Sequence, residues 1–469
     1  MPEIVSRFAF MAAAGLASTL LMAQPAAVEP LVLTSARVLD VAGGRYLSAA
    51  AVIVEGDRIT TIYPKMPASL PAASRQIDLA GTTLVPGLGD MHAYAAPDPD
   101  ADADYFFALG LAHGVTMYRT LNVRLPWAVG ERRRVEAGDV LAPRLWTSGP
   151  RVEFGPPSGP WVVTVADAAG ARRQAETQAR AGVDWIAVSG AVPADVYRVI
   201  VSSAHAAHVR VESESGAASM VQLAGLRVDS IDGLAFLSRS RDEYVQQLAA
   251  RPDLPKDAPA ADLSAFVWEQ MTPADAKKAV AQLVRSRTVL VPMLAASMAR
   301  LEPERVEKDP SLALLPGGRR EKLLAAVAEA VKTLPEQRRN RASQARLTFV
   351  ADFVRAGGRV TTGTGFEENG YPPPGAGVHA ELARLVEAGL TPAQAIRAAT
   401  ITCASLVGAS GAGQIRAGYR ADMIAVEGDP LQHIEDLQRI RLIVRGGEVL
   451  DRNELLTQAR RAILERSGK

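Results

Sequence analysis

The chain has 469 residues, a formal net charge of +1, 48% hydrophobic residues and 5% aromatic residues. This length exceeds what one small core needs and suits a large α/β domain with a smaller accessory domain. The near-neutral charge gives no electrostatic basis for binding nucleic acid or an anionic membrane surface, and the few aromatic residues argue against a base-stacking platform. The single cysteine, Cys403, cannot form an intramolecular disulfide and is expected in the core.

Residues 1–27 have the layout of a secretory signal peptide. Arg7 supplies a positive charge, an apolar run extends from Phe8 to Ala23, and small residues follow up to Ala27. The apolar run of about 16 residues is shorter than the ~20 that span a bilayer. We therefore expect a periplasmic or secreted protein that makes no membrane contact after cleavage, with an uncleaved N-terminal anchor as the alternative.

Short strands are expected at both ends of the mature chain, where apolar runs are separated by turn residues. These runs are Leu31–Leu33, Ala51–Val54, Ile59–Ile62, Asp422–Val426, Leu442–Val444 and Glu448–Leu450. We predict that residues 28–85 and 405–452 together form one small β-sandwich domain. The final residues, 453–469, are expected to form an amphipathic helix.

Between these ends, residues 86–404 alternate helix-period segments with short apolar strands. The helix expected over 171–181 stops at Gly182, and strands follow at Trp185–Val188, Val289–Pro292 and Gly358–Gly363. This alternation is typical of parallel βα units, so we predict a TIM-like (β/α)8 barrel. The charged helical stretch 301–342 is expected to be a barrel helix extended by a lid or surface insertion.

Several segments, spread over nearly the whole mature chain, carry a family resemblance. They are Thr83–His92, Gly114–Arg119, Pro143–Gly149, Ala224–Gly225, Asp229–Ile231, Glu381–Pro392, Ala399–Thr400, Gly418–Met423, Gly428–Leu431 and Gly446–Gly447. Together they resemble the amidohydrolase superfamily, and most of all its imidazolonepropionase-like and dipeptidase-like branch. The resemblance implies hydrolysis of carbon–nitrogen bonds with one or two divalent metals, held at the C-terminal ends of barrel strands.

The resemblance also implies a ligand set that this sequence has largely lost. The family pattern has a His-x-His pair on the first strand, often a carboxylated lysine, a histidine on each of two later strands and an aspartate on the last. Carried over residue by residue, these positions fall at His92, Tyr94, Ala187, Glu212, Asp232 and Gly365. One expected ligand survives, whereas a catalytic zinc takes three, and the glycine also replaces the usual general base. We therefore expect no metal cofactor and a non-catalytic or strongly divergent barrel.

In two alternative interpretations, the protein is an active amidohydrolase that acts on carbon–nitrogen bonds. His92, Glu212, Glu214 and Asp232 could converge at the barrel mouth as a carboxylate-rich site suited to calcium, magnesium or manganese. A metal-free site would instead use His92 as a base, assisted by Tyr94 or Glu214.

The expected partner is a small molecule at the barrel mouth, because loops at that face usually shape a pocket. Glu367, Glu368 and Asn369 belong to the last of these loops. The sequence is compatible with either a monomer or an oligomer. The remaining histidines are expected to be structural, and they are His113, His205, His208, His379 and His433.

Overall fold

The computed structural model describes residues 29–48, 51–94, 103–157, 159, 161–214, 218–234, 237, 243, 260–365 and 371–467. The predicted signal peptide, residues 1–27, lies outside the described residues, as do Glu367, Glu368 and Asn369. No helix in the described ranges is long and apolar enough to cross a membrane.

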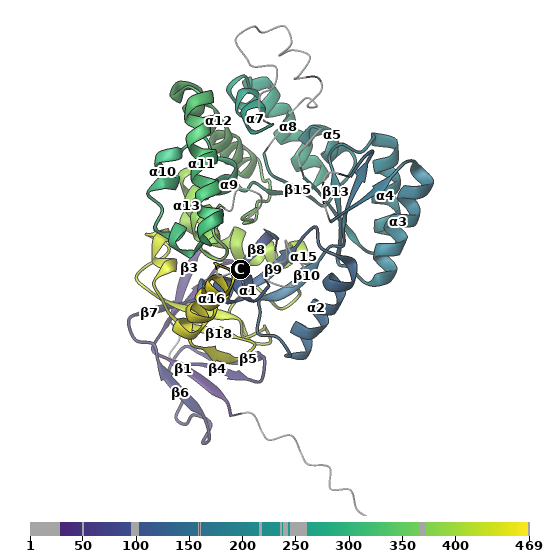
Figure 1. The fold of residues 1–469 in the computed structure, drawn as a ribbon. Helices are drawn as coiled ribbons and strands as arrows, with labels where there is room; N and C mark the ends of the chain where they lie inside the picture. The colour runs from purple at the N-terminus through teal and green to yellow at the C-terminus, as the bar shows by residue number, and fades with distance from the viewer. Residues whose placement is uncertain are drawn as a thin grey trace, which may run out of the picture.

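Strands from both ends of the chain form two sheets at the bottom of Figure 1. The first has the order β5-β4-β1-β6, and these strands are Arg58–Tyr63, Ala51–Glu55, Leu31–Thr34 and Arg75–Asp78. The second has the order β19-β18-β17-β7-β2-β3, and these strands are Glu448–Leu450, Ile440–Arg445, Met423–Glu427, Thr82–Pro86, Arg37–Asp40 and Arg45–Ser48. Antiparallel pairing of β7 with β17 places Pro86 opposite Met423, so both ends of the chain share one sheet.

The two sheets have a common apolar interior. Leu33 and Val52 from the first sheet belong to the same buried cluster as Leu84 and Met423 from the second. Gly56 supports this arrangement locally, because its φ of +56° is the left-handed conformation needed in the tight turn between β4 and β5.

The middle of the chain forms parallel strands alternating with helices, as predicted. One set has the order β10-β9-β8, and its strands are Arg144–Thr147, Val115–Thr120 and Leu88–Ala93. The other has the order β12-β11-β13-β14-β15-β16, and its strands are Val162–Val165, Arg151–Phe154, Trp185–Ser189, Arg210–Glu214, Ser230–Asp232 and Val289–Val291. These strands are mostly buried on both faces, which is usual where helices cover a parallel sheet.

Backbone contacts join these two sets to each other and to the segment 360–365. The contacts are the Ser148–Trp185 bridge, the Leu290–Val360 bridge and the hydrogen bond from Met91 N–H to Thr362 O at 2.9 Å. They link β10 to β13, β16 to the segment 360–365, and that segment back to β8.

The strand predicted at Gly358–Gly363 differs from a regular ladder. It makes one bridge, at Val360, and continues as irregular backbone. The buried Asp90 side chain also holds this segment, because its oxygens accept from the Thr364 N–H (3.0 Å) and hydroxyl (2.6 Å). A side chain therefore fixes the end of this segment, which apolar periodicity alone does not reveal.

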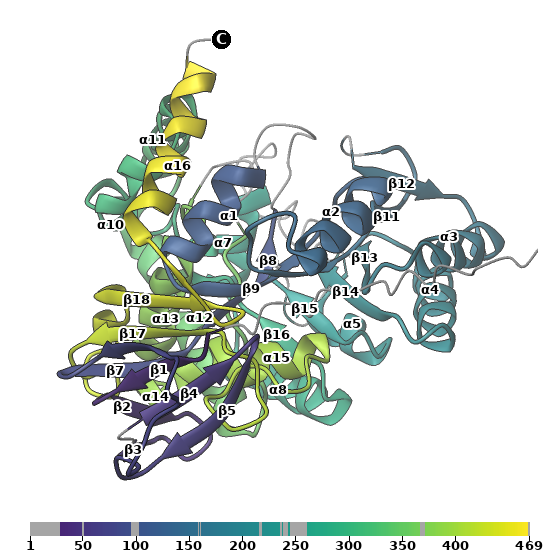
Figure 2. The same cartoon turned by 90° about the horizontal axis from the view of Figure 1, so that it is seen from below.

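Helices surround the parallel strands (Figure 2). Those before β16 are α1 Ala103–Ala112, α2 Leu125–Ala137, α3 Ala168–Ala181, α4 Ala194–Ala206, α5 Met220–Gly225, α7 Ala260–Glu269 and α8 Pro273–Ser286. Those after β16 are α9 Leu294–Ser297, α10 Pro303–Glu307, η1 Pro310–Leu314, α11 Gly317–Thr333, α12 Glu336–Arg355, α13 Ala376–Glu387, α14 Pro392–Arg397, η2 Ala398–Thr402, α15 Cys403–Val407, η3 Ile434–Gln438 and α16 Arg452–Ser467. The charged stretch 301–342 is thus several consecutive helices, and Cys403 is buried as predicted.

A buried ion pair ties the parallel strands to the terminal sheets. Arg144 of β10 donates from Nε (2.7 Å) and Nη2 (3.3 Å) to the carboxylate of Asp422, next to β17. The same carboxylate accepts the backbone N–H of Gly446 at 2.6 Å. Asp422 therefore has a structural role, because it joins β10 to the end of β17 and to the turn at Gly446.

Removing the Asp422 carboxylate is expected to destabilise the fold strongly. Asp422→Ala leaves the half-buried Arg144 without its partner, and breaking a buried pair costs about 3–5 kcal/mol. Asp57→Ala is the matched control, because its pair with Arg420 is far more exposed and should contribute about 0–1 kcal/mol. Urea unfolding measures both, and equal losses would contradict this role for Asp422.

Candidate functional site

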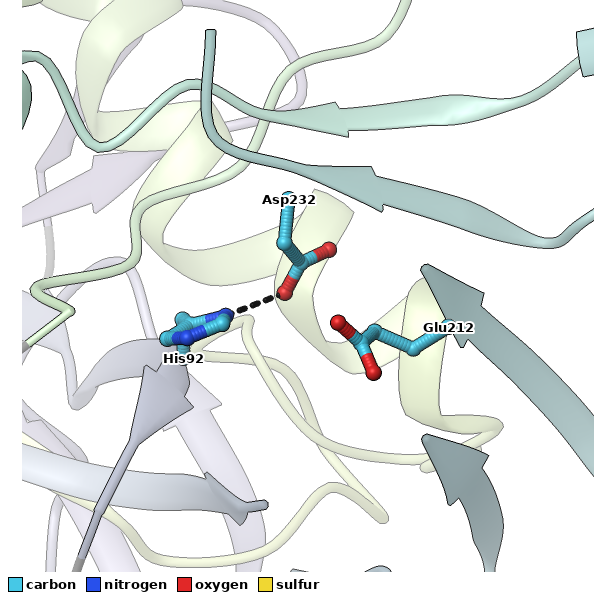
Figure 3. Close-up of side chains that lie close together, drawn as sticks. All are labelled: His92, Glu212 and Asp232. Atoms are coloured by element: carbon cyan, nitrogen blue, oxygen red, sulfur yellow. Dashed lines mark hydrogen bonds and ion pairs between the residues drawn. The ribbon is translucent and has the colours of Figure 1, made fainter. Parts of the chain in front are cut away.

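Three acidic or imidazole side chains meet where the parallel strands end. His92 comes from β8, Glu212 from β14 and Asp232 from β15, and all three are buried. Figure 3 shows them pointing toward one another, and one potential ligand atom from each lies within 4.8 Å of the others. Because the carboxyl ends of parallel strands meet at one edge, residues far apart in sequence are gathered there.

Both ring nitrogens of His92 are engaged. Nδ1 lies 2.5 Å from Asp232 Oδ2, and Nε2 lies 2.8 Å from the hydroxyl of Tyr94. The Tyr94 hydroxyl donates to Glu214 Oε1 at 2.6 Å, and the Asn122 amide donates to both of these oxygens at 3.2 Å. The imidazole is therefore held between a carboxylate and a phenol.

Arg119 of β9 brings a fixed positive charge into the same site. Its guanidinium is fully buried and donates to Asp232 Oδ2 (2.5 Å) and Ser230 Oγ (2.8 Å). Its Nε donates to the carbonyl of Met91 at 2.6 Å, and the group lies 4.5 Å from the centre of the Trp185 ring. These contacts fix the guanidinium beside Asp232 and neutralise that carboxylate.

Arg151 does the same for Glu214. Its Nη1 donates to Glu214 Oε2 at 2.8 Å, and Nη2 pairs with Glu153 Oε1 at 2.8 Å. Burial lowers the pKa of Arg151, but the nearby charges of Glu214, Tyr94 and Glu153 raise it by more than burial lowers it. The net shift is upward, so the guanidinium stays charged.

Glu212 has no such partner among the described residues. It is 1% exposed, and its Oε1 accepts no hydrogen bond there. Burial, followed by the charges of Asp232 and Glu214, raises its pKa well above the ordinary range, although Arg119 and Arg151 oppose the shift. Burial without a cation bound to it therefore favours the protonated form of this carboxyl.

The Arg119 contact works against a metal ion at these side chains, whose potential ligand atoms otherwise lie close enough together to hold one. Arg119 already places a positive charge on the Asp232 oxygen that would coordinate an ion, and two cations there would repel each other.

Two further family positions offer no ligand atom. Ala187 lies opposite Glu212 in the register of β13 and β14, and its methyl group cannot coordinate. Gly365 donates its N–H to the His92 carbonyl at 2.9 Å with a φ of +58°. A Cβ at this glycine would lie 2.6 Å from Met293 Sδ, so an aspartate here would require the flexible Met293 side chain to move.

The structure brings together the candidates proposed from the sequence, namely His92, Tyr94, Glu212, Glu214 and Asp232. Sequence reasoning missed Arg119, Asn122, Arg151 and Ser230. Arg119 had a usable signal, because it is the one charged residue in the otherwise apolar or hydroxyl-bearing strand Val115–Thr120.

Comparisons with known proteins agree with this architecture. The model of the amidohydrolase family matches residues 335–450, and no curated protein sequence matches the chain. Among solved structures, a bottromycin amidohydrolase has a TM-score of 0.69 and 21% identity, covering 92% of this chain and 90% of that chain. A Xaa-Pro dipeptidase with bound methionine in the active site has a TM-score of 0.65 and 18% identity, covering 90% and 100%.

A putative prolidase from Bifidobacterium longum has a TM-score of 0.65 and 22% identity, covering 92% of this chain and 100% of that chain. At these identities the solved structures establish the fold, while the family model supplies the sequence evidence. The resemblance to the amidohydrolase superfamily, predicted from the sequence, is therefore confirmed.

Proposed function

We propose that this chain binds a small molecule at the mouth of an amidohydrolase-type barrel and does not hydrolyse it through a metal centre. The observation that carries the proposal is the bond from the buried Arg119 guanidinium to Asp232. Together with the Arg151–Glu214 pair and the protonated Glu212, it balances the charges of the site without an ion. The superfamily consists of hydrolases of carbon–nitrogen bonds, so this chain would be a divergent member.

The proposal includes a closed (β/α)8 barrel and a β-sandwich built from both termini. Closure is supported by the backbone contacts that link β10 to β13, β16 to residues 360–365, and those residues to β8. The sandwich is supported by the apolar cluster common to the two terminal sheets.

The ligand is proposed to be a small amide, such as a dipeptide. The described residues around Glu214 are polar, namely Tyr94, Asn122 and Arg151. The Glu214 side chain itself is 25% exposed. These groups suit a ligand with an amine or amide donor for Glu214. The names of the similar structures, a Xaa-Pro dipeptidase and a bottromycin amidohydrolase, support the same class.

A second candidate function is metal-free hydrolysis of such an amide. It is favoured by one observation, the position of the His92 imidazole between Asp232 and the Tyr94 hydroxyl. A carboxylate that orients a histidine is an arrangement used in general-base chemistry. Because the Tyr94 hydroxyl donates its proton to Glu214, His92 would act as a base only toward a substrate or water that takes the place of this hydroxyl. Export to the periplasm or medium is proposed for either function, supported by the signal-peptide pattern of residues 1–27.

A panel of dipeptides, cyclic imides and lactams separates the two functions. The binding proposal expects at least one compound to raise the melting temperature, with no product formed above the uncatalysed rate, with or without added manganese or zinc. Turnover that disappears in His92→Gln would overturn it in favour of hydrolysis. Chromatography of the reaction mixtures and thermal unfolding are the two measurements.

Removing the Arg119 guanidinium is expected to create a metal site. Arg119→Met removes the guanidinium bound to the buried Asp232, which keeps only its contacts with His92 and Ser230, and breaking such a pair costs about 3–5 kcal/mol. We expect manganese to restore much of this stability, because the ion replaces the lost charge between Asp232 and Glu212. The control is Arg144→Met, which also loses a partly buried ion pair but lies away from the site. Stoichiometric metal in the unaltered protein would refute the argument.

The raised pKa of Glu212 makes the free energy of unfolding depend on pH. A carboxyl whose folded-state pKa lies above its ordinary value of 4.5 stabilises the fold fully only below that value, and this stabilisation declines as the pH rises. Glu212→Gln should therefore match the unaltered protein near pH 4.5 and exceed it increasingly at higher pH, by about 1.4 kcal/mol for each unit of raised pKa. Exposed Glu136→Gln should show no growing gap in urea titrations.

A further inference from the structure

Arginines gather at the end of the parallel strands opposite the His92 site. Arg210 is the first residue of β14, and Arg227, Arg287 and Arg359 lie just before β15, β16 and the segment that begins at Val360. Because these strands are parallel neighbours, their amino ends meet at one edge. Four consecutive strands thus each bring one guanidinium to the same end of the molecule.

These arginines line a cavity of about 720 Å³. Arg198 and His205, both from α4, complete its basic lining, and hydroxyl groups come from Ser202, Ser286 and Ser405. The volume lies in the range of small-molecule sites, roughly 300–1,000 Å³. The only carboxylate among the lining residues is that of Asp229.

The positive charge of this cavity is not neutralised within the described part of the chain. Asp229 already accepts from His205 Nε2 and from the Val211 N–H, each at 2.8 Å. No carboxylate of the described residues forms an ion pair with the five lining arginines. The C-terminal ends of α4, α5 and α8 offset only about half a charge each. A local excess of positive charge therefore remains in a chain whose net charge is +1.

Two of the arginines occupy positions where glycine is the usual residue. Arg227 and Arg287 end their helices with φ of +63° and +58°, a left-handed conformation that side chains with a Cβ rarely adopt. Helices α2, α3 and α15 end instead at Gly138, Gly182 and Gly408 in the same conformation. Backbone geometry thus favours glycine at both positions, and their guanidinium groups call for another explanation.

We propose that this cavity binds a phosphate-bearing small molecule. Guanidinium groups bind phosphate oxygens through paired charge-assisted hydrogen bonds, and several of them converging on one cavity suit a group with two or more negative charges. The lining serines add hydroxyl donors. The phosphate can belong to a soluble molecule or to a phospholipid headgroup. This site lies at the opposite strand ends from His92 and does not depend on the function proposed there.

Isothermal titration of the intact protein with inorganic pyrophosphate tests the proposal. One bound pyrophosphate per chain is expected, with affinity that falls as salt increases. The double variant Arg227→Gly/Arg287→Gly should bind at least about tenfold more weakly, while its melting temperature stays unchanged or rises, because glycine relieves the left-handed strain. A purely structural role for these arginines would instead lower the melting temperature.

The matched control is Arg172→Gln/Arg173→Gln, which removes the same charge from the exposed face of α3, outside the cavity. It should bind pyrophosphate like the unaltered protein. Co-sedimentation with phosphatidylglycerol vesicles, compared with phosphatidylcholine vesicles, distinguishes the sources: retention that needs Arg227 and Arg287 assigns a lipid headgroup, and no retention assigns a soluble phosphate. Absence of binding to both pyrophosphate and vesicles, or equal weakening in the control, would overturn the proposal.

Discussion

The bond between Arg119 and Asp232 is the constraint on which the chemistry of this site depends. It places a buried positive charge and a buried carboxylate in direct contact, so each balances the charge of the other. Asp232 Oδ2 also contacts the His92 ring, so the same carboxylate orients the imidazole. Glu212 lacks a bound cation among the described residues, and burial raises its pKa. The surroundings of three side chains thus depend on the position of Arg119.

The direction of the strands separates two electrostatic environments. Strand β14 begins at Arg210 and ends with Glu212 and Glu214, so a single strand contributes a cation to one end and carboxyl groups to the other. Its neighbour β15 has Arg227 before its first residue and Asp232 at its last. Carboxyl groups converge at one edge with arginines that neutralise them, whereas arginines converge at the opposite edge with a single aspartate. The same parallel topology therefore builds a neutralised site and a basic cavity.

Much of the fold was accessible from the sequence, because it rests on local signals. The stop at Gly182 and the apolar run after it predicted α3 and β13 correctly, since glycine and periodicity act within a few residues. The convergence of His92, Glu212 and Asp232 was also accessible, through the alignment of strand ends. The ion pairs were not, because Arg119 reaches Asp232 across 113 residues of sequence. Side-chain pairing across a sheet has no periodicity, and the irregular segment 360–365 likewise depends on a distant partner, Asp90.

The positions at which the family resemblance implies metal ligands depend on one another. An aspartate at position 365 would require the flexible Met293 side chain to move. Even a well-placed aspartate would face Asp232 already bound to Arg119, and Ala187 would still offer no bridging group. A metal site loses its affinity when any of its charges or ligands is missing. The described residues instead form a hydrogen-bonded polar network around His92, in which Arg119 pairs with Asp232 and Arg151 with Glu214.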